Sequence, residues 1–207
     1  MQKDSRNTQR NIQLHRKIVA TFRFNPYGDL LAGIELNNLI SKNLWEDLPR
    51  EEIVSVIGPA YPAGEPKGYV IVADSALNYY DGSCDMIVTD LDGPVDKILN
   101  HTESIKVVHA HGDNIGKLVK FVPRMQGVVL GTTQSVPLQR VRNIGGFTDG
   151  DRSVIMGVLM GAKKIYIHGF DYARPVDEPQ DVKMKKMAFG KEIIDSIKSA
   201  EVLYVKR

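Results

Sequence analysis

Four aspartates in this sequence could act together: Asp74, Asp90, Asp92 and Asp113. Each lies just after a short run of apolar, β-branched residues. Carboxylates held close together repel one another unless a cation neutralises them or some are protonated. Oxygen ligands suit Mg²⁺, which is typically held by one or two carboxylates together with substrate phosphates. We therefore predict a Mg²⁺ site. Asp90 and Asp92 would share one ion, because residues two apart on an extended segment point the same way. Taken singly, each aspartate has an alternative role as a cap or turn residue.

Three histidines lie near the same segments. His109 and His111 would share a face of an extended segment and could ligate a transition metal, with His168 as the third imidazole. A zinc site is disfavoured because such sites need three or four converging ligands. We expect His111 to contact phosphate or assist proton removal and His109 to pack. A structural role for both is the alternative.

Paired glycines, Gly145 and Gly146, precede a predicted helix start. They allow a close backbone approach and leave amides available for an anion. Asp149 and Asp151 would repel a bare phosphate, so we expect them to accept hydrogen bonds from a ribose, a base or metal-bound waters. The alternative is a glycine turn followed by an acidic first helical turn that complements the helix dipole.

Short apolar runs continue through the chain from Ile53 onward. Runs that are apolar on both faces are typical of a parallel sheet buried on both sides. Helical patterns separate several of them, which predicts an α/β fold with an open, doubly wound, mostly parallel (Rossmann-like) sheet. Ligands bind beyond the carboxyl ends of such strands, where the acids and histidines lie. The predicted strands are residues 53–57, 69–73, 86–88, 105–108, 128–130, 165–167 and 202–205.

Three helices are predicted from apolar residues at helical spacing. Thr148 would cap the second helix, with Asp151 three residues later as in a capping box, and Gly161 would close it. The apolar stripes are Ile115, Leu118, Val119 and Val122; Val154, Ile155, Val158, Leu159 and Ala162; and Met184, Met187, Ala188, Ile194 and Ile197.

The first 50 residues form a predicted N-terminal helical region, followed by an α/β catalytic domain over residues 51–207. The segment Asn25-Pro26-Tyr27-Gly28 is predicted to be a turn within this region. Residues 1–23 share the positive charge of a transit peptide but are not rich in serine as such signals are. We therefore expect a solvated basic arm.

The composition excludes several classes of protein. The 27 basic and 25 acidic residues give a net charge of +2, with no nucleic-acid footprint. The single Cys84 excludes an intrachain disulfide and fits a reducing compartment. No apolar run approaches the roughly 20 residues that span a bilayer. P-loop, GxGxxG and GxSxG motifs are absent. We expect a cytoplasmic protein without a membrane or nucleic-acid partner, and the sequence leaves a homodimer open.

Four motifs follow one another along the chain: VTDLDG (88–93), HAHGDN (109–114), GTTQ (131–134) and NIGGFTDGDR (143–152). Together they resemble the archaeal 6-hydroxymethyl-7,8-dihydropterin pyrophosphokinase family, whose core is similar to thiamin pyrophosphokinase. The resemblance covers about residues 51–172. It implies Mg²⁺-dependent transfer of diphosphate from ATP to the hydroxymethyl group of a reduced pterin, with release of AMP, in folate or methanopterin-type cofactor synthesis.

The resemblance also implies roles for individual residues. Asp90 and Asp92 match the acidic pair that holds Mg²⁺ and ATP phosphates, while Asp74 and Asp113 match neighbouring strand-end acids. With His111, Asp90 and Asp92 form the predicted catalytic set. The residues predicted to bind ATP or the pterin are Gly58, Ser75, Asn114, Thr132, Thr133, Gln134, Asn143, Gly145, Gly146, Thr148, Asp149 and Asp151.

Two departures from the family pattern lie near the predicted nucleotide or pterin pocket, so they bear on how the substrates are bound more than on the fold. The stretch from Gly58 to Gly68 is short where a longer crossover is expected, and Ser75 stands where glycine is frequent. Three other readings stay open: a nucleotide-sugar glycosyltransferase using the DxD of Asp90 and Asp92, a metal phosphohydrolase built on His109 and His111, and an inactive nucleotide- or pterin-binding module.

Overall fold

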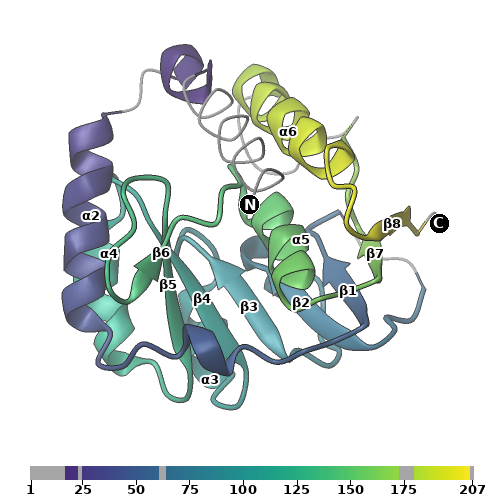
Figure 1. The fold of residues 1–207 in the computed structure, drawn as a ribbon, viewed down its shortest axis with the longest axis horizontal. Coiled ribbons are helices and arrows are strands. Elements are labelled where there is room, and N and C mark those ends of the chain that lie inside the picture. Colours follow the sequence, from purple (N-terminus) through teal and green to yellow (C-terminus); the bar gives the residue numbers. More distant parts are fainter. Residues whose placement is uncertain (1–16, 23–24, 61–63, 173–179, 206–207) are drawn as a thin grey trace.

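An eight-stranded, entirely parallel sheet forms the centre of the computed structural model, which describes residues 17–22, 25–60, 64–172 and 180–205 (Figure 1). The strand order is β6-β5-β4-β3-β2-β1-β7-β8. The order reverses at β1, which pairs with β2 on one side and β7 on the other. The strands are β1 Ile53–Ile57, β2 Tyr69–Ala73, β3 Met86–Thr89, β4 Ile105–Ala110, β5 Val129–Thr133, β6 Val141–Arg142, β7 Lys164–His168 and β8 Glu201–Tyr204.

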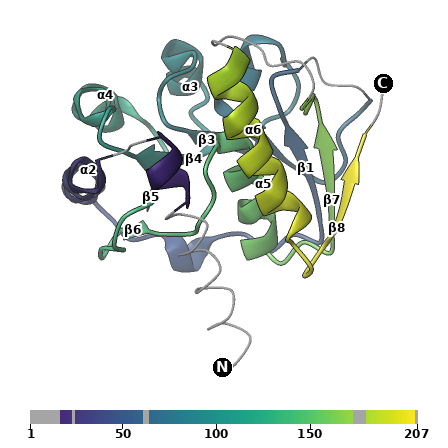
Figure 2. The ribbon, with the colours of Figure 1, turned by 90° about the horizontal axis from the view of Figure 1, so that it is seen from above.

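Helices cover both faces of the sheet, which confirms the doubly wound fold. Side chains of α2, α3 and α4 pack in one core layer, and side chains of α5 and α6 pack in the other. Figure 2 shows α2 beside α4 and α6 beside α5. The α-helices are α2 Pro26–Leu39, α3 Val95–Asn100, α4 Ile115–Phe121, α5 Asp149–Leu159 and α6 Gln180–Asp195, and 3₁₀ turns span Trp45–Asp47, Asp74–Asn78 and Val122–Arg124.

The chain before the sheet departs from one prediction. The segment expected to be a turn is the start of α2: the Asn25 side chain caps the helix by accepting a hydrogen bond from the Tyr27 amide at 3.1 Å, and Pro26 occupies the first helical position. Ala32 and Leu36 of α2 are buried against the sheet. Most of the predicted basic arm lies outside the described residues.

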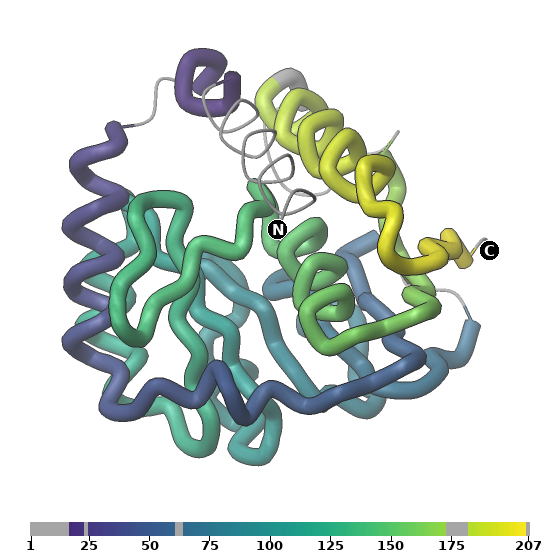
Figure 3. The backbone as a smooth tube through the Cα atoms, viewed as in Figure 1, coloured from purple at the N-terminus to yellow at the C-terminus, as the bar shows by residue number. Residues whose placement is uncertain are grey.

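The first described helix, over residues 17–22, packs against the C-terminal helix. Ile18 and Phe22 contact Phe147, Phe189 and Ile193, so segments from the two ends of the chain lie side by side (Figure 3). Among the described residues, no helix is both long and apolar enough to cross a membrane.

Candidate active site

A cavity of about 730 Å³ lies at the carboxyl ends of the central strands. Residues that follow β1 to β5 and β7 line it, together with side chains of α2, α5 and α6. This position includes the point between β1 and β7 where the strand order reverses, which is where open α/β sheets bind ligands. Ten of the predicted site residues line this cavity: Asp74, Ser75, Asp90, Asp92, His111, Asp113, Gln134, Thr148, Asp149 and Asp151.

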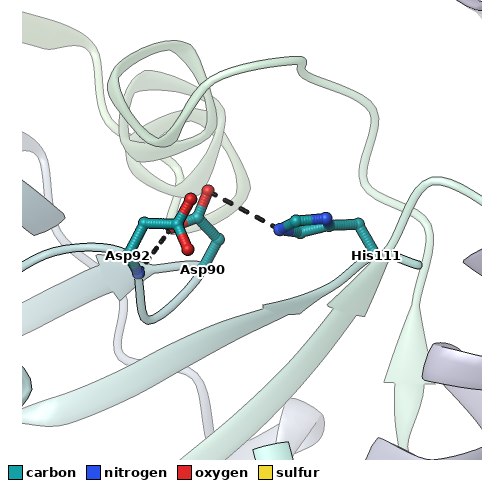
Figure 4. A group of neighbouring side chains, drawn as sticks. All are labelled: Asp90, Asp92 and His111. Carbon is teal, nitrogen blue, oxygen red and sulfur yellow. Dashed lines mark hydrogen bonds and ion pairs between the residues drawn. The ribbon is translucent and has the colours of Figure 1, made fainter. Parts of the chain in front are cut away.

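Asp90 belongs to two groups of potential metal ligands. It lies with Asp92 and His111 in one group and with Asp74 and Asp149 in the other, and within each group the ligand atoms are all within 4.8 Å of one another. Figure 4 shows the first group, with Asp90 and His111 facing each other from the ends of β3 and β4. The two groups share Asp90, so three further carboxylates and one imidazole have ligand atoms near its side chain.

The loop that carries Asp90 and Asp92 is a tight turn, not the extended segment expected from the sequence. Leu91 between them has φ +68°, and the Asp92 amide donates a hydrogen bond to Asp90 Oδ1 at 3.0 Å. Leu91 and Asp74 (φ +21°) are the two non-glycine residues with positive φ among the described residues. Positive φ at a non-glycine residue is a strained conformation, and such strain is typical of functional sites. The tight turn still places Asp90 and Asp92 in one ligand group.

Asp74 is buried beside Asp90, and its surroundings disfavour its charge. Thr89 Oγ1 donates a hydrogen bond to Asp74, and Gly93 leaves room for the carboxylate, since a Cβ on Gly93 would lie 2.3 Å from Asp74 Oδ2. Burial first, and then the charge of Asp90, raise the pKa of Asp74 to about 7. A cation at this point would stabilise the ionised form.

Asp149, at the start of α5, is the third acid of this group. Its carboxylate accepts a hydrogen bond from Arg152 at 2.8 Å, and Arg152 itself is buried. Burial and the nearby charge of Asp90 raise the pKa of Asp149 well above its usual value, although the Arg152 guanidinium opposes this shift. Asp149 thus belongs to a group that could ligate a cation, whereas the sequence predicted an acceptor for a ribose, a base or metal-bound waters.

His111 lies between two carboxylates. Its Nε2 is 3.9 Å from Asp90 Oδ2 and its Nδ1 is 4.0 Å from Asp113 Oδ2. The Asp113 side chain is 89% exposed, and it belongs to neither ligand group found among the described residues. His109 is buried in β4, with Nδ1 3.1 Å from Thr132 Oγ1, and it also lines the cavity.

Asn114 ties the two loops of the site together. Its Nδ2 donates hydrogen bonds to the backbone carbonyls of Asp90 (2.8 Å) and His109 (2.7 Å), and its Oδ1 accepts one from the His111 amide (3.1 Å). The side chain is fully buried. Asn114 therefore positions Asp90 and His111 and does not line the cavity.

The loop before α5 is held mainly by hydrogen bonds between its own residues. Thr148 and Asp151 form the predicted capping box, and the Asp151 carboxylate also accepts the Phe147 amide at 2.7 Å. Gly145 and Gly146 have φ +79° and +85° and are not among the residues that line the cavity. Asn143 Nδ2 donates to the carbonyls of the preceding loop, at residues 134 and 135.

Three other predicted binding residues do not line the cavity either. Thr132 and Thr133 are buried in β5. Gly58 makes room for an aromatic side chain, because a Cβ there would lie 2.5 Å from the ring of Phe170, which lines the cavity. Gln134, by contrast, reaches the cavity itself.

Two sets of cavity residues were missed by sequence reasoning. Asp29 of α2 is 4% exposed and bonds to Gly112 and Gln134. Lys183 and Lys186 line the cavity from α6. The two lysines are three residues apart on a helix, and this spacing is the one local signal that their side chains share a face. No local signal marks Asp29.

Comparison with known proteins gives three close relatives, although no family model matches the sequence. A 6-hydroxymethyl-7,8-dihydropterin pyrophosphokinase of Pyrococcus furiosus is 38% identical over 194 residues, covering 83% of each chain. Its counterpart in Methanocaldococcus jannaschii is 30% identical, covering 93% of this chain and 96% of that protein. A third, from Methanothermobacter thermautotrophicus, is 41% identical over 59% of each chain. Among solved structures, alanine racemase of Clostridium difficile 630 reaches a TM-score of only 0.24 at 15% identity, too weak a likeness to carry an argument.

Proposed function

This chain belongs to the archaeal-type 6-hydroxymethyl-7,8-dihydropterin pyrophosphokinase family, and we propose that its strand-end cavity transfers the diphosphate of ATP to the pterin hydroxymethyl group with the help of Mg²⁺. The reaction gives AMP and the pterin diphosphate. The resemblance of the strand-end motifs to this family is confirmed by the relatives. The product would enter the synthesis of a folate or methanopterin-type cofactor. The single thiol of Cys84 fits a reducing compartment, and we propose the cytoplasm.

The observation that carries the proposal is the position of Asp90 between two groups of ligands. The residues fit divalent cations that prefer oxygen, since four of the five ligands are carboxylates. Burial first, and then the charge of Asp90, raise the pKa values of Asp74 and Asp149, and a bound cation would stabilise their ionised forms. Asp90, Asp92 and His111 would hold one ion, and Asp74, Asp90 and Asp149 another. Bound Mg²⁺ neutralises the charge that develops on the phosphate oxygens.

In the reaction, the hydroxymethyl oxygen attacks the β-phosphorus of ATP. An O–P bond forms there, the bond from the β-phosphorus to the oxygen bridging the α-phosphate breaks, and AMP leaves with that oxygen. Such a transfer depends on positioning and charge neutralisation more than on a covalent partner. We assign the proton of the hydroxymethyl group to His111, which faces Asp90 at 3.9 Å.

The negative charge of the triphosphate also calls for basic side chains in the cavity. Lys183 and Lys186 line it from α6. Lysine ammonium groups bind phosphate oxygens as point charges. We propose that these two lysines bind ATP phosphates. Arg152 is committed to Asp149 and to the carbonyl of Phe147.

The proposal is tested by anaerobic incubation with ATP, Mg²⁺ and 6-hydroxymethyl-7,8-dihydropterin, followed by chromatography of the nucleotides and pterins. We expect AMP and pterin diphosphate in equal amounts, and no AMP without the pterin. AMP formed only with thiamin would contradict the choice of acceptor. A nucleoside diphosphate released from a nucleotide sugar would support the glycosyltransferase. Acceptor-independent phosphate release with Mn²⁺ or Zn²⁺ would support the phosphohydrolase, and ATP or pterin binding without turnover would support the binding module.

A further inference from the structure

The N-terminal helix α2 contributes a side chain to the cavity. Asp29 is 4% exposed, yet it lines the cavity at the ends of β4 and β5. Its Oδ1 accepts the Gly112 amide at 2.9 Å, and its Oδ2 accepts Gln134 Nε2 at 2.7 Å. The two bonds fix the carboxylate against the sheet, although it comes from a helix more than 80 residues away in sequence.

The Asp29 carboxylate can accept further hydrogen bonds. Its two oxygens offer about four acceptor sites, and among the described residues each oxygen accepts one bond. Gln134 also lines the cavity, and because its Nε2 is bonded to Asp29, its carbonyl oxygen is the end left for a ligand. Asp29 and Gln134 thus form an acceptor-rich wall in the cavity.

This wall is next to the reacting groups. Gly112, which Asp29 holds, directly follows His111, and His111 Nε2 is 3.9 Å from Asp90. A flat molecule against Asp29 and Gln134 would therefore extend toward the acids. The other end of the cavity, beyond β1 and β7, is lined by Phe170 and Tyr172, whose rings lie 6.2 Å apart, and is left for the nucleotide.

We propose that Asp29 and Gln134 recognise the 2-amino-4-oxopyrimidine edge of the pterin, and so determine acceptor specificity. This edge presents the 2-amino group and the adjacent ring N–H, which are adjacent donors that complement a carboxylate. Adenine presents a single amino donor beside a ring nitrogen that is itself an acceptor, which the carboxylate would repel. The inference rests on the proposed function, since it names the residues that read the acceptor of that reaction.

Asp29→Asn tests the inference with little change in shape. The oxygen of the substituted amide can still accept a hydrogen bond from the Gly112 backbone, and a rotated Gln134 amide can accept from the new NH₂ group. The fold is retained, but part of the acceptor wall becomes a donor. We expect the affinity for 6-hydroxymethylpterin to fall roughly 10- to 100-fold, as for loss of a charged hydrogen bond. The KM for ATP should stay within a factor of about three.

A ligand with an altered edge separates recognition from a merely structural role. In 6-hydroxymethyllumazine, an oxygen replaces the 2-amino group. The wild type should bind the pterin more tightly than the lumazine, and Asp29→Asn should lose most of this preference. Glu35→Gln removes a carboxylate from the same helix outside the cavity and should keep it.

Calorimetric titration, in the presence of a non-hydrolysable ATP analogue, gives the affinities of the wild type and of both variants for the pterin and the lumazine. Equal weakening of pterin and lumazine in Asp29→Asn, or an unchanged preference, would overturn the inference while wild-type turnover leaves the proposed function intact. A rise in the KM for ATP with unchanged pterin affinity would instead assign this wall to the nucleotide. Absence of pterin-dependent AMP in the wild type would overturn the proposed function, and the inference with it.

Discussion

The Asn114 side-chain amide donates a 2.8 Å hydrogen bond to the backbone carbonyl of Asp90. The same amide group bonds to the His109 carbonyl at 2.7 Å, so one buried side chain joins the loops after β3 and β4. Those loops carry Asp90 and His111, whose side chains face each other at 3.9 Å. The geometry of the ligand groups therefore depends on a residue that does not line the cavity.

Asn114→Ala should impair catalysis only by displacing the loops that carry Asp90 and His111. Loss of the amide leaves buried backbone groups unbonded, which should lower the free energy of unfolding by roughly 1–3 kcal/mol. A shift of the Asp90 loop by about 1 Å should lower kcat roughly 100-fold. Denaturant unfolding and steady-state kinetics measure the two effects. Asn100→Ala, an exposed asparagine at the end of α3, is the control. Full activity in Asn114→Ala would refute the positioning role.

Asp90→Asn should be far more damaging than Asp113→Asn. Asp90 belongs to both ligand groups, whereas the Asp113 side chain is 89% exposed and belongs to neither group among the described residues. We expect kcat/KM to fall at least about 1,000-fold in Asp90→Asn, since charge stabilisation is the main contribution of such sites. Asp113→Asn should lose less than about fivefold. Equal losses in the two variants would instead support the sequence-based assignment of Asp113 as a metal ligand.

Lys183→Met and Lys186→Met should each raise the KM for ATP roughly tenfold, because each removes a charge-assisted contact to phosphate. The effect should shrink at high ionic strength, where phosphate contacts are screened. Lys185→Met, an exposed lysine of the same helix that does not line the cavity, is the matched control. Initial rates at varied ATP concentration decide the matter, and identical KM values in all three variants would exclude a phosphate-binding role.

The metal-free protein should become less stable as the pH rises. The pKa of Asp74 is raised from 3.8 to about 7, so over this range the folded protein retains a proton that the unfolded chain releases. The stability that protonated Asp74 contributes is fully present below about pH 4 and is lost as the pH rises through about 7. Unfolding in the presence of a chelator should show this loss, and Asp74→Asn should flatten it.

Added Mg²⁺ should reverse that trend, because it binds the ionised carboxylates. The stabilisation by Mg²⁺ should therefore be larger at pH 8 than at pH 5. Parallel pH profiles for wild type and Asp74→Asn, with or without Mg²⁺, would contradict the assignment of Asp74 to the cation site.

The sequence predicted the central strands because their burial on both faces leaves a continuous apolar signal. The runs at 53–57 and 69–73 correspond residue for residue to β1 and β2. The two-residue β6 and the six-residue α3 were missed because such short elements carry no readable periodicity. β4 extends to Ala110, two residues beyond its prediction, which places His109 inside the sheet.

The site was predictable where it follows the strands and not where tertiary packing supplies it. Asp74 and Asp90 were found because strand ends meet at one edge of a parallel sheet. Asp29, Lys183 and Lys186 reach the same cavity from helices near the two ends of the chain, and only the packing of α2 and α6 brings them there. The strained turn at Leu91 likewise has no local signal, since leucine rarely adopts positive φ.

The central claim is that the groups around Asp90 carry out diphosphate transfer from ATP to the pterin. The most direct measurement is a reaction with ATP labelled at the β-phosphorus, followed by separation of the nucleotides, pterins and free phosphates. We predict that the wild type moves the label into the pterin diphosphate, one label for each AMP released, and that Asp90→Asn leaves it in ATP. Label recovered as free phosphate or diphosphate, or transferred at the wild-type rate by Asp90→Asn, would contradict the account.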